Sequence, residues 1–197
     1  TIGLEPTGPG SRLLYLEIKN MGGIGVRLGG ANSSIAYCYL HDGGNHAVHV
    51  NAAGATVGPG NQLSNNTGSF GVMLSQAATV IGNDLHHNQN GITVISGISG
   101  AAIRGNTIWA NTLRGIYLAT GVDNLTVWHN TVQGNAQIGL FVSNNNTGHD
   151  ARNNIFSNNG FWGVDGSNAA FTSFDFNDFF GNASGDCSQP SIAIRNA

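Results

Sequence analysis

The chain has 197 residues, a formal net charge of −3, and 40% hydrophobic but only 9% charged residues. Seven Lys and Arg without a basic run argue against nucleic-acid binding, and no apolar stretch approaches the roughly 18 residues of a membrane-spanning helix. Two cysteines are too few for a disulfide framework or a cysteine-based zinc site. We therefore expect one domain with an apolar core, no cofactor and no metal.

The two ends of the chain differ from its middle. Residues 1–12 are predicted to be a linker-like segment, because they contain Pro6, Pro9 and three glycines. Residues 183–197 are predicted to form a partial cap or to begin a further coil through Ile192 and Ile194. Between them, residues 13–182 repeat every 22–24 residues. Open ends of a repeat array expose strand edges, so we expect end-to-end packing or a longer parent chain.

The most regular part of each repeat reads N-x-Φ-x-x-N, where Φ is apolar. Six copies occur: NQLSNN (61–66), NDLHHN (83–88), NTIWAN (106–111), NTVQGN (130–135), NIFSNN (154–159) and NDFFGN (177–182). Looser copies, YLEIKN (15–20) and YCYLHD (37–42), precede them. Counting the last position of each copy puts Asn20 and Asp42 in one series with Asn66, Asn88, Asn111, Asn135, Asn159 and Asn182.

A second motif, G-Φ-x-Φ, follows each copy, as in GITV (91–94), GIYL (115–118) and GLFV (139–142). Side chains alternate along a strand, so Ile116 and Leu118 should point inward and Tyr117 outward. We expect the leading glycines, such as Gly115, to supply bend conformations.

A third short apolar element precedes each asparagine motif, around Ile35, Val57, Val80, Ile103, Val127 and Phe174. Three short strands separated by Gly and Asn turns fit one turn of a parallel β-helix. The sequence therefore predicts an all-β solenoid of about eight coils of 22–24 residues.

These repeats resemble the right-handed parallel β-helix repeats of the pectate-lyase-like superfamily, from about Leu13 to Asn182. The resemblance implies a right-handed solenoid. It says little about activity, because that superfamily includes polysaccharide lyases, hydrolases, C5-epimerases, phage tailspikes and non-catalytic surface proteins. The N-T-D and G-H-G segments of polygalacturonases and the D-P-H motif of mannuronan epimerases do not occur in this sequence.

Stacked coils lie about 4.8 Å apart, so equivalent asparagines should form columns. An amide in such a column can donate to the next coil and accept from the previous one. Asn also tolerates the left-handed backbone of a tight bend. By the same count, Cys38 and Cys187 lie six coils apart, roughly 29 Å, and should not form a disulfide.

One candidate binding site is the outward column Arg104, Trp128 and Arg152. An indole can stack on a sugar face, and a guanidinium pairs with a carboxylate. The alternative is a surface cation–π stack that only covers an apolar edge.

Tyr117 and Phe141 are outward neighbours in adjacent coils. They are candidates for a sugar platform or a protein contact, or they are a cross-strand aromatic pair that stabilises the sheet. The seven histidines are interpreted as solvated turn residues. A zinc site needs three or four converging ligands, and the sequence has no H-x-x-x-H helix, while adjacent strand residues such as His86 and His87 should face apart.

Two functions fit these features. The first is a non-catalytic module, secreted or at the cell surface, that contacts a polysaccharide, with an acidic polysaccharide as the expected partner. The alternative is a lyase or C5-epimerase acting on a uronate-containing glycan. There, Arg104 or Arg152 would stabilise the substrate carboxylate and Tyr117 or His129 would act as the base. The enzyme hypothesis requires the column of Arg104, Trp128 and Arg152 to lie on the same face of the solenoid as Tyr117.

Overall fold

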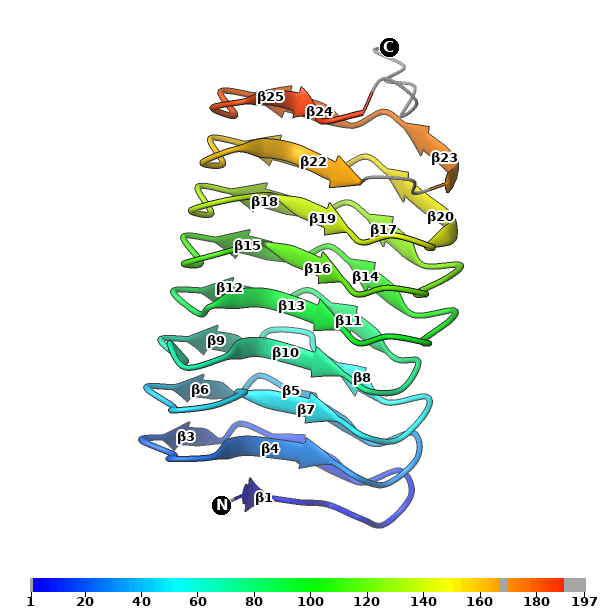
Figure 1. Cartoon of the computed structure of the whole chain (residues 1–197). Helices are drawn as coiled ribbons and strands as arrows, with labels where there is room; N and C mark the ends of the chain where they lie inside the picture. The colour runs from blue at the N-terminus through cyan, green and yellow to red at the C-terminus, as the bar shows by residue number, and fades with distance from the viewer. Residues whose placement is uncertain (1, 167–169, 190–197) are drawn as a thin grey trace.

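Three short strands and three bends make up each coil, and the coils stack in sequence order (Figure 1). The computed structural model describes residues 2–166 and 170–189. Within these ranges the regular elements are strands, and no helix has the length and apolar character to cross a membrane. Equivalent strands of successive coils pair in parallel into sheets of nine, eight and eight strands. The predicted all-β solenoid of about eight coils is confirmed.

Sheet 1 collects the strands of the G-Φ-x-Φ motifs and forms the front of the molecule in Figure 1. Its strands are β1 (Ile2–Leu4), β4 (Ile24–Leu28), β7 (Val48–Val50), β10 (Phe70–Leu74), β13 (Asn90–Val94), β16 (Ile116–Leu118), β19 (Leu140–Val142), β22 (Trp162–Gly166) and β25 (Gly185–Cys187).

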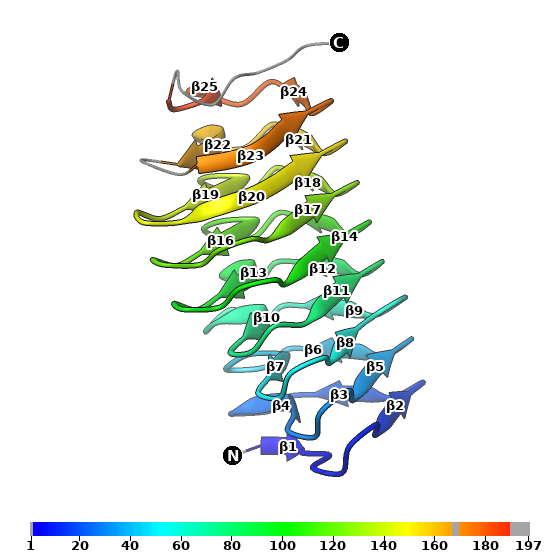
Figure 2. The ribbon, with the colours of Figure 1, turned by 90° about the vertical axis from the view of Figure 1, so that its right-hand side faces the viewer.

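Sheet 2 follows sheet 1 in each coil and faces the viewer in Figure 2. Its strands are β2 (Arg12–Leu14), β5 (Ser34–Ala36), β8 (Thr56–Val57), β11 (Thr79–Ile81), β14 (Ala102–Arg104), β17 (Thr126–Trp128), β20 (Thr147–Arg152) and β23 (Ala170–Asp175).

Sheet 3 contains the middle residues of the asparagine motifs and completes the coil. Its strands are β3 (Glu17–Lys19), β6 (Tyr39–His41), β9 (Gln62–Ser64), β12 (Asp84–His86), β15 (Thr107–Trp109), β18 (Thr131–Gln133), β21 (Ile155–Ser157) and β24 (Asp178–Phe180).

The core is the column of inward side chains between the three sheets. In one coil, Ile103 of sheet 2, Ile108 of sheet 3 and Ile116 of sheet 1 are all 0% exposed. Burial of each such side chain stabilises the fold by roughly 1.5–3 kcal/mol. Because every coil repeats this arrangement, the alternate side chains of each strand are held on the outside, in columns.

Two asparagine ladders run along the bends on either side of sheet 3. Asn111, 1% exposed, donates from Nδ2 to Asn135 Oδ1 (2.9 Å) and accepts the backbone N–H of Asn88 at Oδ1 (3.0 Å). Such side-chain hydrogen bonds link the last asparagines of the motifs, Asn66 through Asn182, into one ladder. They link the first asparagines, Asn61 through Asn177, into the other. The predicted direction, donating to the next coil and accepting from the previous one, is confirmed.

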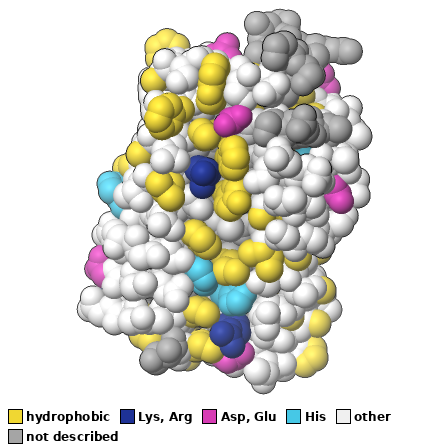
Figure 3. Space-filling view, in the orientation of Figure 1, with side chains coloured by type: hydrophobic (Ala, Val, Ile, Leu, Met, Phe, Trp, Pro, Cys, Tyr) yellow, Lys and Arg dark blue, Asp and Glu magenta, His cyan; other side chains and the backbone are white. Residues whose placement is uncertain are grey.

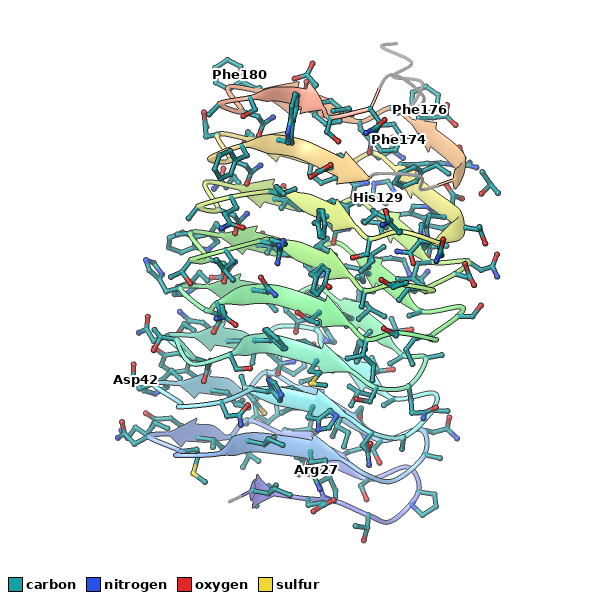
Figure 4. All side chains as sticks on the ribbon, in the orientation of Figure 1. Arg27, Asp42, His129, Phe174, Phe176 and Phe180 are labelled. Atoms are coloured by element: carbon teal, nitrogen blue, oxygen red, sulfur yellow. The ribbon has the colours of Figure 1, made fainter. Side chains whose placement is uncertain are left out.

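The left-handed bend conformation belongs to the residue before each ladder asparagine, as at Gly105 (φ 62°) and Ala110 (φ 50°). Asn20 and Asp42, both with φ 55°, lie in this bend column, and Figure 4 shows Asp42 at the edge of the solenoid. Their predicted place in the ladder is therefore wrong by one residue. Gly43 occupies the ladder position instead and donates its N–H to Asn66 Oδ1 (3.2 Å).

The glycines that open the sheet 1 motif serve close packing, and the expectation of a special bend conformation is wrong. Gly115 does not have a positive φ. A Cβ placed there would lie 2.7 Å from Gly139 O and would also overlap the side chain of Val132. The absence of a side chain at each of these glycines lets the backbone of the next coil and a core side chain pack closely against it.

Strands also occur within both terminal segments. β1 lies in residues 1–12 and pairs with β4, and β25 lies in residues 183–197 and pairs with β22. Ile192 and Ile194 lie outside the described residues. Cys38 and Cys187 are both free thiols, which confirms that they do not pair with each other.

Candidate functional site

The outer face of sheet 1 carries two columns of side chains. The first is the middle position of the motif: Arg27, His49, Met73, Thr93, Tyr117, Phe141 and Asp165. The second precedes the motif glycine: His46, Phe70, Asn90, Arg114, Ile138 and Trp162. Together they form a band along this face in which hydrophobic side chains are interspersed with basic, His and acidic side chains (Figure 3).

The centre of the band is a cluster of Arg114, Tyr117 and Phe141, which we call the Arg114 cluster. The rings of Tyr117 and Phe141 stack at 5.6 Å with planes 25° apart. The Arg114 guanidinium carbon lies 5.0 Å from the Tyr117 ring centroid and 4.6 Å from that of Phe141. The two rings therefore hold the cation in place by cation–π attraction.

Arg114 has no acidic partner among the described residues. In the part of the chain that the structure describes, the ion pairs of Lys and Arg side chains are Lys19–Glu17, Arg27–Glu5 and Arg152–Asp150. The positive charge of Arg114 is thus available to an anion from outside the chain.

The lower part of the band combines histidines that are neutral at pH 7 with an arginine that is paired with a carboxylate. His46 stacks on Phe70 (5.0 Å) and contacts Ser69 Oγ through Nδ1 (2.7 Å). Burial, and then the neighbouring His49, lowers the pKa of His46 to about 4. Burial and then Arg27 also lower the pKa of His49. Arg27, labelled at the lower end of this face in Figure 4, is balanced by Glu5 (3.5 Å).

The predicted column on sheet 2 also exists. Arg104, Trp128 and Arg152 align across β14, β17 and β20. The Arg104 guanidinium lies 6.0 Å from the Trp128 ring centroid. On the other side of the indole, Arg152 forms an ion pair with Asp150 on its own strand (2.6 Å). Of the two arginines, Arg104 is the one that stacks on Trp128.

The five sequence-predicted residues thus fall into two groups on different sheets. Tyr117 and Phe141 lie on sheet 1, whereas the column of Arg104, Trp128 and Arg152 lies on sheet 2. His129 is exposed at the bend after β17, with φ 55°. The pairing of Arg104 with Tyr117 that the enzyme reading invoked is therefore not present. Sheet 1 supplies a different arginine for Tyr117, namely Arg114.

Sequence reasoning missed Arg114 because it lies outside the G-Φ-x-Φ motif. The signal that would have found it is the position just before the motif glycine, where several coils carry an aromatic or basic side chain. At that position the chain places His46, Phe70, Arg114 and Trp162.

The histidines are not all solvated turn residues. His149 is 0% exposed in the core, and burial lowers its pKa to about 4. His86 and His87 contact each other through their Nδ1 atoms (2.8 Å) on sheet 3 and the adjoining bend. Within the described ranges, no group of three or more His, Cys, Asp and Glu side chains could hold a metal ion.

Comparison with known proteins identifies the fold. A family model described as "right handed beta helix region" matches residues 22–179. The periplasmic alginate epimerase AlgG (T265N mutant) superposes with a TM-score of 0.78 at 17% identity, covering 93% of this chain and 48% of that one. Pectate lyase Pel9A gives a TM-score of 0.69 at 18% identity, covering 92% and 55%.

The Dettilon tailspike protein gives a TM-score of 0.51 at 12% identity, covering 98% of this chain and 61% of that one. This chain therefore spans about half to three fifths of the length of these structures. A search of curated protein sequences gave no match.

Proposed function

The chain belongs to the right-handed β-helix family, and from that premise we propose that it is a polysaccharide-binding module. Its ligand is an acidic glycan that lies across the outer face of sheet 1. The glycan carboxylate pairs with Arg114, while the rings of Tyr117 and Phe141 contact the apolar faces of the sugars. Arg104, Trp128 and Arg152 on sheet 2 form a separate patch.

One observation carries this proposal: Arg114 lies against both stacked rings, Tyr117 and Phe141, and has no acidic partner in the described structure. A guanidinium prefers a carboxylate over water when the site around it is partly dehydrated. The names of two structural neighbours, an alginate epimerase and a pectate lyase, point to the same ligand class. For the same reason we propose that the chain is secreted or displayed at the cell surface.

The binding test compares two arginines that each stack on an aromatic ring. Titration calorimetry with alginate and polygalacturonate should show that Arg114→Gln weakens binding at least about tenfold, or ~1.4 kcal/mol. The matched variant Arg104→Gln on sheet 2 should bind as the unchanged protein does. Dependence on Arg104 alone would move the site to sheet 2, and absence of binding to both polymers would overturn the proposal.

A second candidate function is lyase or C5-epimerase chemistry on the same glycan. The observation that favours it is the 5.0 Å contact of Arg114 with the Tyr117 ring, which brings a cation and a phenol together on one face. Removal of the proton next to a uronate carboxylate needs charge stabilisation and a base. Here Arg114 would supply the first and Tyr117 the second.

The two candidates differ in their products. Incubation with alginate and polygalacturonate should be followed by ultraviolet absorbance for an unsaturated uronate and by NMR for a changed ratio of C5 epimers. Binding without either product supports the non-catalytic module. A product that Tyr117→Phe abolishes while calorimetry still detects binding supports the enzyme.

A further inference from the structure

A shallow groove lies at the bend between sheets 2 and 3, away from the Arg114 cluster. In three successive coils the bend residue is a glycine: Gly60, Gly82 and Gly105 (φ 74°, 63° and 62°). Below them the same position is Tyr37 and above them it is His129, each with φ 55°. A cavity of about 340 Å³ lies at this bend, and its lining includes Gly60, Gln62, Gly82, Asp84, Gly105 and Thr107. Tyr37 and Pro59 occupy the space beside Gly60 and Gly82, whereas the space beside Gly105 is open.

Polar side chains of sheet 3 form one wall of the groove, and Asp84 is its centre. Trp109 Nε1 donates to Asp84 Oδ1 (2.7 Å), which fixes the carboxylate. Trp109 in turn stacks on His86 (4.4 Å between ring centroids), and Gln62 Nε2 contacts His86 Nε2 (3.2 Å). The second oxygen of Asp84 has no partner among the described residues, so it remains free to accept hydrogen bonds.

The groove is negative rather than positive. Asp84 forms no ion pair with another described residue. Burial lowers the pKa of His86, so this ring is neutral at pH 7. Arg104, which precedes the groove residue Gly105, holds its guanidinium over Trp128 on sheet 2. An anionic ligand would therefore meet the charge of Asp84 without a compensating cation.

Exposed aromatic rings stand at the lower end of the groove. Tyr37 lies against Gly60, where an added Cβ would be 2.6 Å from Tyr37 Cδ1. Tyr37 also stacks on Tyr15 (5.4 Å), and the two residues are 51% and 76% exposed. His129 stands exposed at the upper end, four coils above Tyr37, or roughly 19 Å at the spacing of paired strands.

We propose that this groove is a second glycan site, specific for a neutral oligosaccharide. Sugar hydroxyls donate to the free oxygen of Asp84 and exchange hydrogen bonds with Gln62 and Thr107, while a sugar face stacks on Tyr37. The charge of Asp84 selects against uronates, which are the ligands proposed for the Arg114 cluster. The two sites are therefore independent, and failure of one leaves the other standing.

The decisive variant refills the groove with a side chain that this bend already accepts. Gly105 has open space around its Cβ position and lies in the column of His129. Gly105→His should therefore keep the fold and block the groove. The matched control is Gly134→His at the bend after sheet 3, where φ is 59°, the space is equally open and His87 is the precedent.

Binding is measured on an array of neutral gluco-, manno- and galacto-oligosaccharides, with alginate and polygalacturonate fragments beside them. We expect at least one neutral class to bind, with a loss of about tenfold or more in Gly105→His and in Asp84→Ala. Gly134→His and Arg114→Gln should retain that binding. No bound neutral class, or an equal loss in Gly134→His, would overturn the proposal. Thermal melts followed by circular dichroism check that each variant folds.

Discussion

At the scale of single residues, the ladder asparagines satisfy the hydrogen-bonding capacity of a buried amide. Asn111 donates from Nδ2 to Asn135 Oδ1 and to Leu85 O (2.9 and 3.3 Å). Its Oδ1 accepts from the backbone N–H and the Nδ2 of Asn88 (3.0 and 3.3 Å). Two donors and two acceptors are thus used at one position. No other uncharged side chain of this size can donate two hydrogen bonds and accept two at its carbonyl oxygen.

The ladder predicts a large cost for an almost isosteric change, Asn111→Asp. The carboxylate would lose both donors and would face two oxygens at a position only 1% exposed. We expect the free energy of unfolding to fall by roughly 2–4 kcal/mol, measured as the urea midpoint at constant slope. The exposed neighbour variant Thr112→Ala should change it by less than about 0.5 kcal/mol. A midpoint equal to that of this control would contradict the structural role of the ladder.

At the scale of elements, each sheet 1 strand combines core, packing and site in a few residues. In β16, Ile116 and Leu118 are 0% exposed, while Tyr117 between them points outward. Gly115 before the strand lies so close to Gly139 O and Val132 that a side chain does not fit. The position of the Arg114 cluster therefore depends on the close packing of the neighbouring Gly115.

Replacing Gly115 tests whether the strand and the Arg114 cluster depend on its close packing. Gly115→Ala should lower the free energy of unfolding by roughly 1–3 kcal/mol, because the added methyl group overpacks a close contact. It should also shift the near-ultraviolet circular dichroism signal of Tyr117. The control is Gly22→Ala, where φ is not positive and no atom lies within 4 Å of the Cβ position. Equal stability of the two variants would show that the coils adjust at no cost.

Sequence periodicity was sufficient to predict the strands and their outward columns, because register in a solenoid follows from counting. The placement of Tyr117 beside Phe141 and of Arg104 beside Trp128 was predicted in this way. Counting could not tell whether two columns face the same side of the solenoid, because that depends on the bends between strands. It also missed the groove, whose signal is a glycine at the bend in three successive coils, Gly60, Gly82 and Gly105.

At the scale of the whole molecule, the stacked coils share a continuous apolar core, which buried polar side chains interrupt in the coil that contains β20. Where one coil has Val122 and Leu125, the next has Asn146 and His149, all 0% exposed. Asn146 Oδ1 accepts the N–H of Val122 (2.7 Å), and His149 Nδ1 accepts the N–H of Leu125 (3.3 Å). His149 must be neutral to accept this hydrogen bond, so its protonation opposes folding.

This interruption predicts acid-sensitive stability. The folded pKa of His149 lies near 4, below its ordinary value of 6.5, so the unfolded chain binds the proton first. Neutral His149 therefore contributes on the order of 2–3 kcal/mol to the free energy of unfolding. This contribution is complete above about pH 6.5 and is lost as the pH falls toward 4. Half-buried His46 adds to the same trend with the same sign. Urea unfolding at pH 7, 5.5 and 4 should show the decline. His149→Gln should flatten it, whereas the exposed His129→Gln should leave it unchanged; an equal decline in both variants would place the acid sensitivity elsewhere.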